Sequence, residues 1–256
     1  MAEKNAGVGA VVTLSDLTAG YGSYAAIHHL NGSFAQGSLT AIVGPNGSGK
    51  STLLKTIAGL LAPMGGRCRR QVGQTLAYLP QLSELDRGFP ARVRDLVALG
   101  LWQRRGLLGR HRDADRDRMA AALAEVGLEG FDPRPLHTLS GGQLQRAMFA
   151  RVLVQDAALI LLDEPFNAID DKTIRDLTGL IRHWHVEGRT VVTVAHDLSL
   201  VRRHFPQTLL LARRAVAWGP TAEVLTEANI VRARSFQEAW DEAAPWCAPQ
   251  GAWRAA

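Results

Sequence analysis

One stretch of the 256-residue sequence decides the fold: Leu39-Thr-Ala-Ile-Val-Gly44-Pro-Asn-Gly-Ser-Gly-Lys50-Ser-Thr52. Its first five residues form a short apolar run rich in β-branched side chains, which is typical of a strand. The next eight fit the phosphate-binding loop, in which glycine and four further residues precede Gly-Lys-Ser/Thr. From Ser51 to Leu61 apolar side chains recur with a helical period, and Pro63 stops the helix. Strand, loop and helix in this order predict an α/β fold that binds phosphate.

Each part of this loop suits a phosphate group. Glycines let successive backbone N–H groups point inward, and the following helix adds the partial positive charge of its N-terminus. Lys50 is predicted to reach the β- and γ-phosphates, and the Ser51 hydroxyl to ligate Mg²⁺. The residues expected to contact the nucleotide are Gly44, Pro45, Asn46, Gly47, Ser48, Gly49, Lys50, Ser51 and Thr52.

A second apolar run, Leu159-Ile-Leu-Leu162, ends in Asp163, Glu164 and a proline. Ligands of open α/β sheets bind at the carboxyl ends of strands, which is where these carboxylates fall. Asp163 is predicted to hold the Mg²⁺ shell, and Glu164 to polarise the attacking water as a general base. Taken alone, the pair is equally compatible with a strand end capped by solvated acids.

The stretch Leu139-Ser140-Gly141-Gly142-Gln143 carries a third signal. Ser140 followed three residues later by Gln143 is a capping box that opens a helix. The capping box does not explain Gly141 and Gly142, because glycine in a helix costs up to about 1 kcal/mol. Bare backbone at this position indicates that something approaches closely, and a helix N-terminus offers donors to a phosphate.

Composition excludes several classes of protein. With 46% hydrophobic and 21% charged residues, the chain has the apolar content for a sizeable core and is not disordered. The strongest apolar run, residues 157–162, is far below the roughly 18 to 20 residues that cross a bilayer, and we expect no signal peptide. Cys68 and Cys247 lie far apart, so neither a disulfide framework nor a zinc knuckle is expected, which fits a reducing cytoplasm.

The formal charge of +5 is concentrated in one segment. The segment from Arg92 to Arg118 contains eight arginines and four aspartates, so it alone carries a net charge of +4. The segment is interpreted as a solvated helical face, or as a contact for an anionic membrane surface or an acidic partner. No signature of a nucleic-acid-binding module accompanies the charge, so we expect no nucleic-acid partner.

Predicted strands alternate with predicted helices along the chain. Besides the elements around the phosphate loop, strands are expected at 11–14, 24–30, 158–162 and 190–195, and helices at 142–155 and 171–187. Such alternation implies a mostly parallel sheet covered on both faces. The helical, arginine-rich block at about 90–135 interrupts the alternation and is predicted to be an inserted subdomain.

Together these residues resemble the ATP-binding subunit of ABC transporters, over about residues 8–233. The resemblance implies a P-loop NTPase core with a small antiparallel β-subdomain and an inserted α-helical subdomain. The C-terminal tail, residues 234–256, has no assigned role. The resemblance further implies ATP hydrolysis with Mg²⁺ in a head-to-tail homodimer. Each ATP then lies between the phosphate loop of one chain and Ser140-Gly141-Gly142-Gln143 of the other.

Four more positions match the family's pattern in order. The resemblance implies that Tyr21 stacks on adenine and that Gln81 contacts Mg²⁺ and senses the membrane partner. His196 matches the histidine near the γ-phosphate, and Asp170 matches the loop that crosses the dimer interface. Asn167 and Ile169 depart from the more usual Ser-Ala-Leu-Asp of that loop.

One interval departs from the family. Lys50 and Gln81 lie closer together in the sequence than the family's pattern leads us to expect, and residues 66–75 lack part of the expected antiparallel edge hairpin. The departure concerns the small β-subdomain and leaves the predicted ATP site intact.

Within the family, three stretches resemble the metal-uptake branch, and most closely its zinc members: 89–102, 163–170 and 216–225. The implied partners are permease subunits in the membrane and, indirectly, a periplasmic or extracellular metal-binding protein. The implied location is peripheral, on the cytoplasmic face of the inner (plasma) membrane. The ATPase itself need not touch the metal.

Two alternatives stay open. The first is an importer of manganese or of an iron chelate. The second is a non-transport relative acting on DNA or ribosomes. DNA-repair members insert long coiled coils before the signature, whereas the interval from Gln81 to Ser140 is too short to hold them here. Ribosome-acting members carry two cassettes in one chain, and this chain has one.

Overall fold

The computed structural model of the chain describes residues 9–86, 88–102 and 112–238. Their contacts divide the chain into two compact units. Of the described residues, the first unit contains 9–36, 40–72 and 196–238, and the second contains 37–39, 73–86, 88–102 and 112–195. In the part of the chain that is described, no helix is long and apolar enough to cross a membrane.

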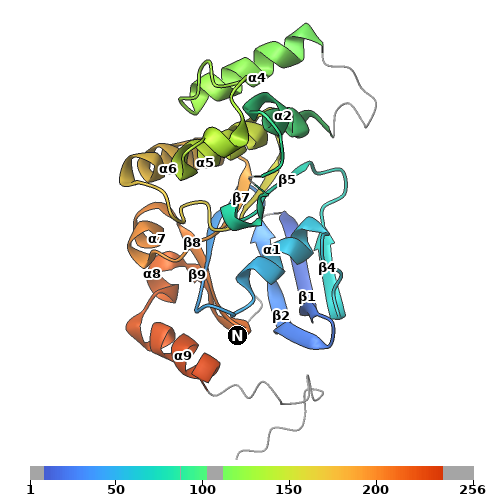
Figure 1. Ribbon diagram of the computed structural model, residues 1–256. Helices are drawn as coiled ribbons and strands as arrows, with labels where there is room; N and C mark the ends of the chain where they lie inside the picture. Colours follow the sequence, from blue (N-terminus) through green and yellow to red (C-terminus); the bar gives the residue numbers. More distant parts are fainter. Residues whose placement is uncertain (1–8, 87, 103–111, 239–256) are drawn as a thin grey trace, which may run out of the picture. The chain divides into compact units, whose positions relative to one another are not determined.

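An antiparallel sheet in the first unit has the strand order β2 (Tyr24–Ala35), β1 (Ala10–Tyr21), β4 (Gly65–Arg70) (Figure 1). Inward-facing side chains such as Val12, Leu14 and Phe34 are buried, as one covered face requires. The expected β-subdomain is therefore present. Residues 66–75 supply a single edge strand, and residues 71–75 contain no second one.

The phosphate loop of the first unit follows β3 (Leu39–Val43) and precedes α1 (Lys50–Ala58). β3 pairs in parallel with β8 (Gln207–Ala212), and β8 pairs antiparallel with β9 (Arg214–Pro220). The unit also contains α7 (Leu198–His204), α8 (Thr221–Val224) and α9 (Glu227–Glu238).

Three predicted boundaries in this unit are wrong. Helix α1 ends at Ala58 rather than Leu61, because Gly59 adopts a left-handed conformation (φ 80°) and its N–H bonds the carbonyls of the last turn. The first strand extends far beyond residues 11–14, to Tyr21, because β1 pairs with β2 as far as Tyr21 and with β4 as far as Thr18. The second strand, predicted at 24–30, continues to Ala35 because β2 pairs with β1 over its whole length.

A parallel sheet in the second unit has the order β5 (Leu76–Leu79), β6 (Leu159–Leu162), β7 (Thr190–Val194). Every residue of β6 and β7 is buried, as expected for parallel strands covered on both faces. Helices α5 (Gly141–Gln155) and α6 (Asp171–Val186) pack together, and the rings of Phe149 and Trp184 stack with centroids 5.7 Å apart. The strands and helices predicted between positions 142 and 195 are confirmed, with ends displaced by one position at most.

The helical block of the second unit contains α2 (Val93–Ala98) and α4 (Asp113–Glu125), with 3₁₀ turns at 99–101 and 136–138. Another 3₁₀ turn, Leu82–Glu84, follows β5. Backbone N–H groups of Val93 and Arg94 donate to the carbonyls of Arg134 and Asp132, which joins the start of the block to its end. Three of the eight arginines of the charged segment, Arg104, Arg105 and Arg110, lie outside the described residues. The predicted domain limits stay predictions.

Candidate functional site

The phosphate loop folds around its own lysine. The Lys50 ammonium donates to the carbonyl oxygens of Gly44 at 3.0 Å and Pro45 at 2.8 Å. The N–H of Leu53 bonds the carbonyl of Gly49 at 2.8 Å, so α1 begins directly at the loop. The Lys50 side chain is therefore already inside the loop, where a phosphate would replace the two carbonyls as its partner.

Two glycines of the loop are required by close packing. Gly44 has φ 155°, and a β-carbon there would overlap the carbonyl oxygen of Leu211. Gly49 has φ 93°, and a β-carbon there would lie 2.7 Å from the carbonyl oxygen of Ala26. Since L side chains rarely adopt such φ values, both positions need glycine for conformation and for space. The loop is thus held between the end of β8 and the start of β2.

Arg213, between β8 and β9, adds a further contact to the loop. Its backbone N–H donates to the Ser48 carbonyl at 3.0 Å, and its carbonyl accepts from the N–H of His28 at 2.8 Å. Its guanidinium lies over the Tyr24 ring, 4.9 Å from the centroid, and donates to the Tyr24 hydroxyl. Tyr24 is the cross-strand partner of Tyr21. Sequence reasoning missed Tyr24 and Arg213 because no local pattern joins residues 189 positions apart.

The loop fits an anionic ligand. The Ser48 hydroxyl is buried and has no hydrogen-bond partner among the described residues. A buried polar atom costs free energy unless it is paired, so its position within a glycine cradle suits a phosphate oxygen. Ser51 and Thr52 lie in the first turn of α1, Tyr21 is 53% exposed at the end of β1, and His196 is exposed after β7. Together with the other residues of the phosphate loop, they make up the predicted site residues of the first unit.

In the second unit, the two acids after β6 lie in different environments. Asp163 is fully buried, its N–H bonds the Leu79 carbonyl at 2.9 Å, and the Tyr78 hydroxyl lies 3.4 Å from its Oδ2. Glu164 is partly exposed in a left-handed conformation (φ 50°), which is uncommon for a non-glycine residue and typical of functional turns. The side-chain amide of Asn167 donates to Glu164 Oε2 at 3.3 Å.

A cavity of about 610 Å³ in the second unit brings Glu164 and Gln81 together. Asn167 and Ala168 line it as well. The 3₁₀ turn after Gln81 and the turn after β6 each supply one side of this cavity. It therefore joins the predicted general base to a predicted Mg²⁺ contact.

The capping box at Ser140 is confirmed. The Ser140 hydroxyl accepts from the Gln143 N–H at 3.2 Å, and the Ser140 N–H donates to Gln143 Oε1 at 3.0 Å. A β-carbon on Gly142 would lie 3.2 Å from Asp170 Oδ2 and from Thr173 Oγ1. The close approach expected at the two glycines is thus made at Gly142 by residues of the same chain.

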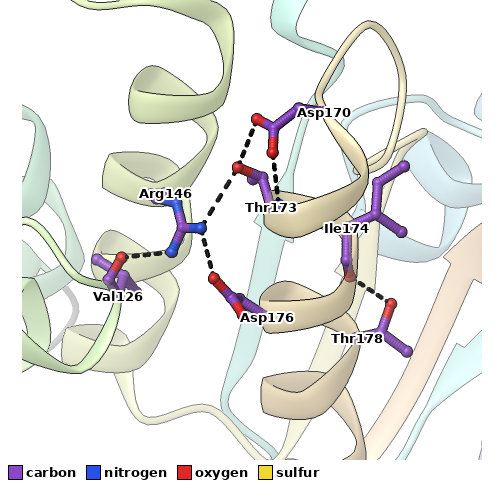
Figure 2. Close-up of polar contacts among 7 residues, drawn as sticks. All are labelled: Val126, Arg146, Asp170, Thr173, Ile174, Asp176 and Thr178. Atoms are coloured by element: carbon purple, nitrogen blue, oxygen red, sulfur yellow. Dashed lines mark hydrogen bonds and ion pairs between the residues drawn. The ribbon is translucent and has the colours of Figure 1, made fainter.

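Asp170 begins α6 as its N-cap residue. Its carboxylate accepts from the Thr173 N–H at 2.9 Å and from the Thr173 hydroxyl at 2.8 Å (Figure 2). These hydrogen bonds favour the charged form and lower the pKa of Asp170 below its usual range. The carboxylate therefore stays ionised beside the first turn of α5.

The structure places the predicted residues in two groups. The first unit holds Tyr21, residues 44–52 and His196. The second holds Gln81, residues 140–143, Asp163, Glu164 and Asp170. Among the described residues, no group of three or more His, Cys, Asp or Glu side chains is arranged to hold a metal ion.

A phosphate loop after a parallel strand, with an acid pair at the end of another parallel strand, defines a P-loop nucleotide hydrolase. The chain belongs to the ABC transporter family, whose sequence pattern matches residues 27–167, and it is an ATPase. It is 42% identical over 219 residues to a protein of Chlamydia pneumoniae named as a metal transport system ATP-binding protein (83% of this chain, 85% of that one).

Two further relatives are named for particular metals. The manganese transport system ATP-binding protein MntB of Bacillus subtilis is 37% identical over 225 residues (86% of this chain, 90% of that one). The zinc transport system ATP-binding protein TroB of Treponema pallidum is 38% identical over 228 residues (87% and 86%). A solved transporter assigned to the metal-chelate type, in an inward-facing conformation, superposes with a TM-score of 0.79 at 28% identity (89% and 90%).

Proposed function

We propose that this chain is the ATP-hydrolysing subunit of an importer for a divalent metal ion, and that the metal is zinc. The observation that carries the proposal is the set of relatives named for metal transport at about two-fifths identity over most of the chain. Zinc is favoured over manganese and iron chelates because residues 89–102, 163–170 and 216–225 resemble the zinc members most closely.

Each predicted site residue has its own role in the proposed hydrolysis step. Lys50 exchanges its bonds to loop carbonyls for the β- and γ-phosphate oxygens, and Tyr21 stacks on adenine. Glu164 takes a proton from the attacking water, while His196 holds the γ-phosphate geometry. Ser51, Gln81 and Asp163 would hold Mg²⁺, which when bound would supply positive charge beside the phosphate oxygens.

The proposed dimer is head-to-tail, with two ATP molecules joining two cassettes. Each ATP lies between the phosphate loop of one chain and Ser140-Gly141-Gly142-Gln143 of the other. The first turn of α5 supports this arrangement, since N–H groups at a helix N-terminus and a polar cap are suited to a γ-phosphate. The closeness of Asp170 to Gly142 supports a role for Asp170 at the same interface.

Closure of the dimer is proposed to pull on a membrane permease through the Gln81 turn and the helical block. The helical block contains a cavity of about 810 Å³ between α2 and α4, lined by Arg94, Arg116, Asp95 and Asp117 among others. The lining combines charged side chains with apolar ones such as Met119 and Leu123, and this mixture suits the end of a permease helix. In this proposal the assembly lies on the cytoplasmic face of the membrane, with a metal-binding protein on the opposite side.

The variant Glu164→Gln tests the dimer. It keeps the size and hydrogen bonding of the side chain but loses the base, so it should bind ATP, dimerise and hydrolyse poorly. Gel filtration with ATP and Mg²⁺ should show the dimer, and the same protein without ATP is the control. A Glu164→Gln protein that stays monomeric with ATP contradicts the proposed arrangement.

Growth of a deletion strain tests the cargo. In chelator-treated medium the strain should grow poorly, and zinc alone should restore growth through low-affinity uptake. Rescue by manganese or iron alone would keep the ATPase and replace zinc as its cargo. A strain with no other metal importer that shows no metal-dependent defect would contradict metal import.

A further inference from the structure

Arg146, on α5, makes hydrogen bonds to two other parts of the second unit, the end of α4 and helix α6 (Figure 2). One guanidinium nitrogen, Nη1, donates to the Val126 carbonyl at 2.9 Å, at the end of α4. The other, Nη2, donates to Asp176 Oδ2 at 2.6 Å and to Thr173 Oγ1 at 3.3 Å, both on α6. The Arg146 side chain is only 15% exposed, so solvent competes weakly for these bonds.

Only an arginine can make this set of contacts. The guanidinium presents several N–H groups in a rigid planar fork, whereas a lysine ammonium is a single point on a flexible stem. A lysine at 146 would keep the charge pair with Asp176 and would not span the distance to the Val126 carbonyl at the same time. The three acceptors therefore specify the shape of the side chain as well as its charge.

The Arg146 bonds reach the signature turn, residues 140–143, through Thr173. Long helical side chains lean toward the N-terminus, over the residue four positions earlier, which here is Gly142. The Thr173 hydroxyl accepts from Arg146 and donates to Asp170, whose Oδ2 lies 3.2 Å from the position that a β-carbon on Gly142 would take. The start of α6 is thus fixed against the first turn of α5 by one continuous chain of contacts.

The predicted general base, Glu164, lies in the same loop as Asp170, six positions earlier in the chain. The turn runs from Glu164 to Asp170. Within it, Asn167 makes two hydrogen bonds to Glu164. The Asn167 N–H donates to the Glu164 carbonyl at 3.2 Å, and its side-chain amide donates to Oε2 at 3.3 Å. Left-handed conformations at Glu164 and Ala168 mark a turn that needs support from its surroundings.

We propose that Arg146 is a positioning residue for ATP hydrolysis. It holds Asp170 against Gly142, and so fixes the Glu164–Asp170 turn relative to the signature turn of the same chain. When the signature turn moves to engage a nucleotide, the turn that carries the base moves with it. The proposal rests on the proposed roles of Glu164 and of residues 140–143.

The test compares Arg146→Met, which removes all three bonds, with Arg175→Met, which removes an exposed arginine from α6. Arg146→Met should lower kcat about 10- to 100-fold, as small misplacements of catalytic groups do, while KM and ATP affinity stay within about twofold. Arg146→Lys should recover part of kcat. Arg175→Met should match the wild type.

Amide hydrogen exchange of the full-length protein without nucleotide measures how firmly the Glu164–Asp170 turn is held. Arg146→Met should speed exchange in the peptide covering residues 164–173, and Arg175→Met should not. If Arg146→Met fails to fold, Thr173→Val replaces it, since it keeps the size of the side chain and removes the hydroxyl that links Arg146 to Asp170, while the backbone N–H of residue 173 still bonds Asp170.

The outcomes separate this proposal from the proposed function. Unchanged kcat and unchanged exchange in Arg146→Met or Thr173→Val overturn the role of Arg146. A rise in KM that accounts for the whole loss of kcat/KM overturns it as well, because Arg146 would then act on binding. If Glu164→Gln hydrolyses ATP normally, the assignment of the base is wrong, and the exchange result still decides whether Arg146 fixes the turn.

Discussion

Gly44 and Leu211 lie in contact, because the carbonyl oxygen at the end of β8 occupies the space that a β-carbon on Gly44 would need. Just after Leu211 in the chain, the Arg213 N–H bonds the Ser48 carbonyl of the same loop. The shape of the phosphate loop therefore depends on a segment far along the chain as well as on its own glycines.

Gly44→Ala should distort the loop, since it adds both a clash with Leu211 and strain at φ 155°. We expect a loss of stability of about 1–3 kcal/mol and a weaker affinity for ATP, measured by denaturant unfolding and calorimetry. The control is Gly179→Ala in α6, where nothing lies within 4 Å of the added carbon. That variant should gain about 0.5–1 kcal/mol. Unchanged stability and ATP affinity in Gly44→Ala would refute the packing argument.

Lys50→Ala should reduce nucleotide affinity. The ammonium sits among the loop carbonyls at 2.8 Å and 3.0 Å, and removing a charged hydrogen-bond donor costs about 1.5–3 kcal/mol, or roughly 10- to 100-fold. Isothermal calorimetry with ATP and Mg²⁺ measures the change. Lys172→Ala, which removes an exposed lysine of α6, should bind as the wild type does. Equal affinity in Lys50→Ala and Lys172→Ala would contradict the role of Lys50.

The two signature glycines should respond differently to alanine. A β-carbon on Gly142 lies 3.2 Å from Asp170 and Thr173, whereas one on Gly141 meets the Ala168 carbonyl at an ordinary 3.5 Å. Gly142→Ala should lower the Tm of the nucleotide-free protein. With ATP present, the same variant should have a lower kcat. Gly141→Ala should leave Tm unchanged or raise it, because alanine favours a helix by up to about 1 kcal/mol. Thermal unfolding of both variants decides the point. An equal drop in Tm would show that Gly142 has no special contact.

Asp170 should make the stability of the protein depend on pH. Its pKa is lowered in the folded state by its bonds to Thr173, so its stabilising effect is complete above its unfolded pKa of about 4. The effect disappears as pH falls through the lower, folded pKa. Urea unfolding of Asp170→Asn should therefore show a deficit relative to the wild type at pH 7 that shrinks below about pH 4. Asp171→Asn, next along the helix, is the control, and a deficit independent of pH would contradict the argument.

The fold followed from local patterns, and the site did so only in part. The loop at 44–51 and the box at Ser140–Gln143 are each a short continuous stretch, so spacing alone predicted them and their flanking elements. Gly142 was flagged by its cost in a helix, but its neighbours Asp170 and Thr173 come from another part of the chain. Side-chain contacts between elements depend on packing, which the spacing of residues does not encode.

The same limit explains the residues that sequence reasoning missed. Arg146 follows the signature as an ordinary helix former, and its partner Asp176 is 30 residues away. Tyr24 and Arg213 meet only because β2 and the turn after β8 converge on the phosphate loop. Helix α1 was predicted too long because apolar periodicity continued past Gly59, where left-handed backbone ends the helix.

The most direct test is the uptake of radioactive zinc by a deletion strain to which either the wild-type or the Glu164→Gln gene has been returned. Cells carrying the wild-type gene should accumulate zinc from medium with trace metal, and cells carrying Glu164→Gln should not, although both proteins are present in equal amounts. Unlabelled manganese in excess should leave uptake unchanged. Equal zinc uptake with Glu164→Gln and with the wild type would contradict the claim that hydrolysis by this chain drives metal import.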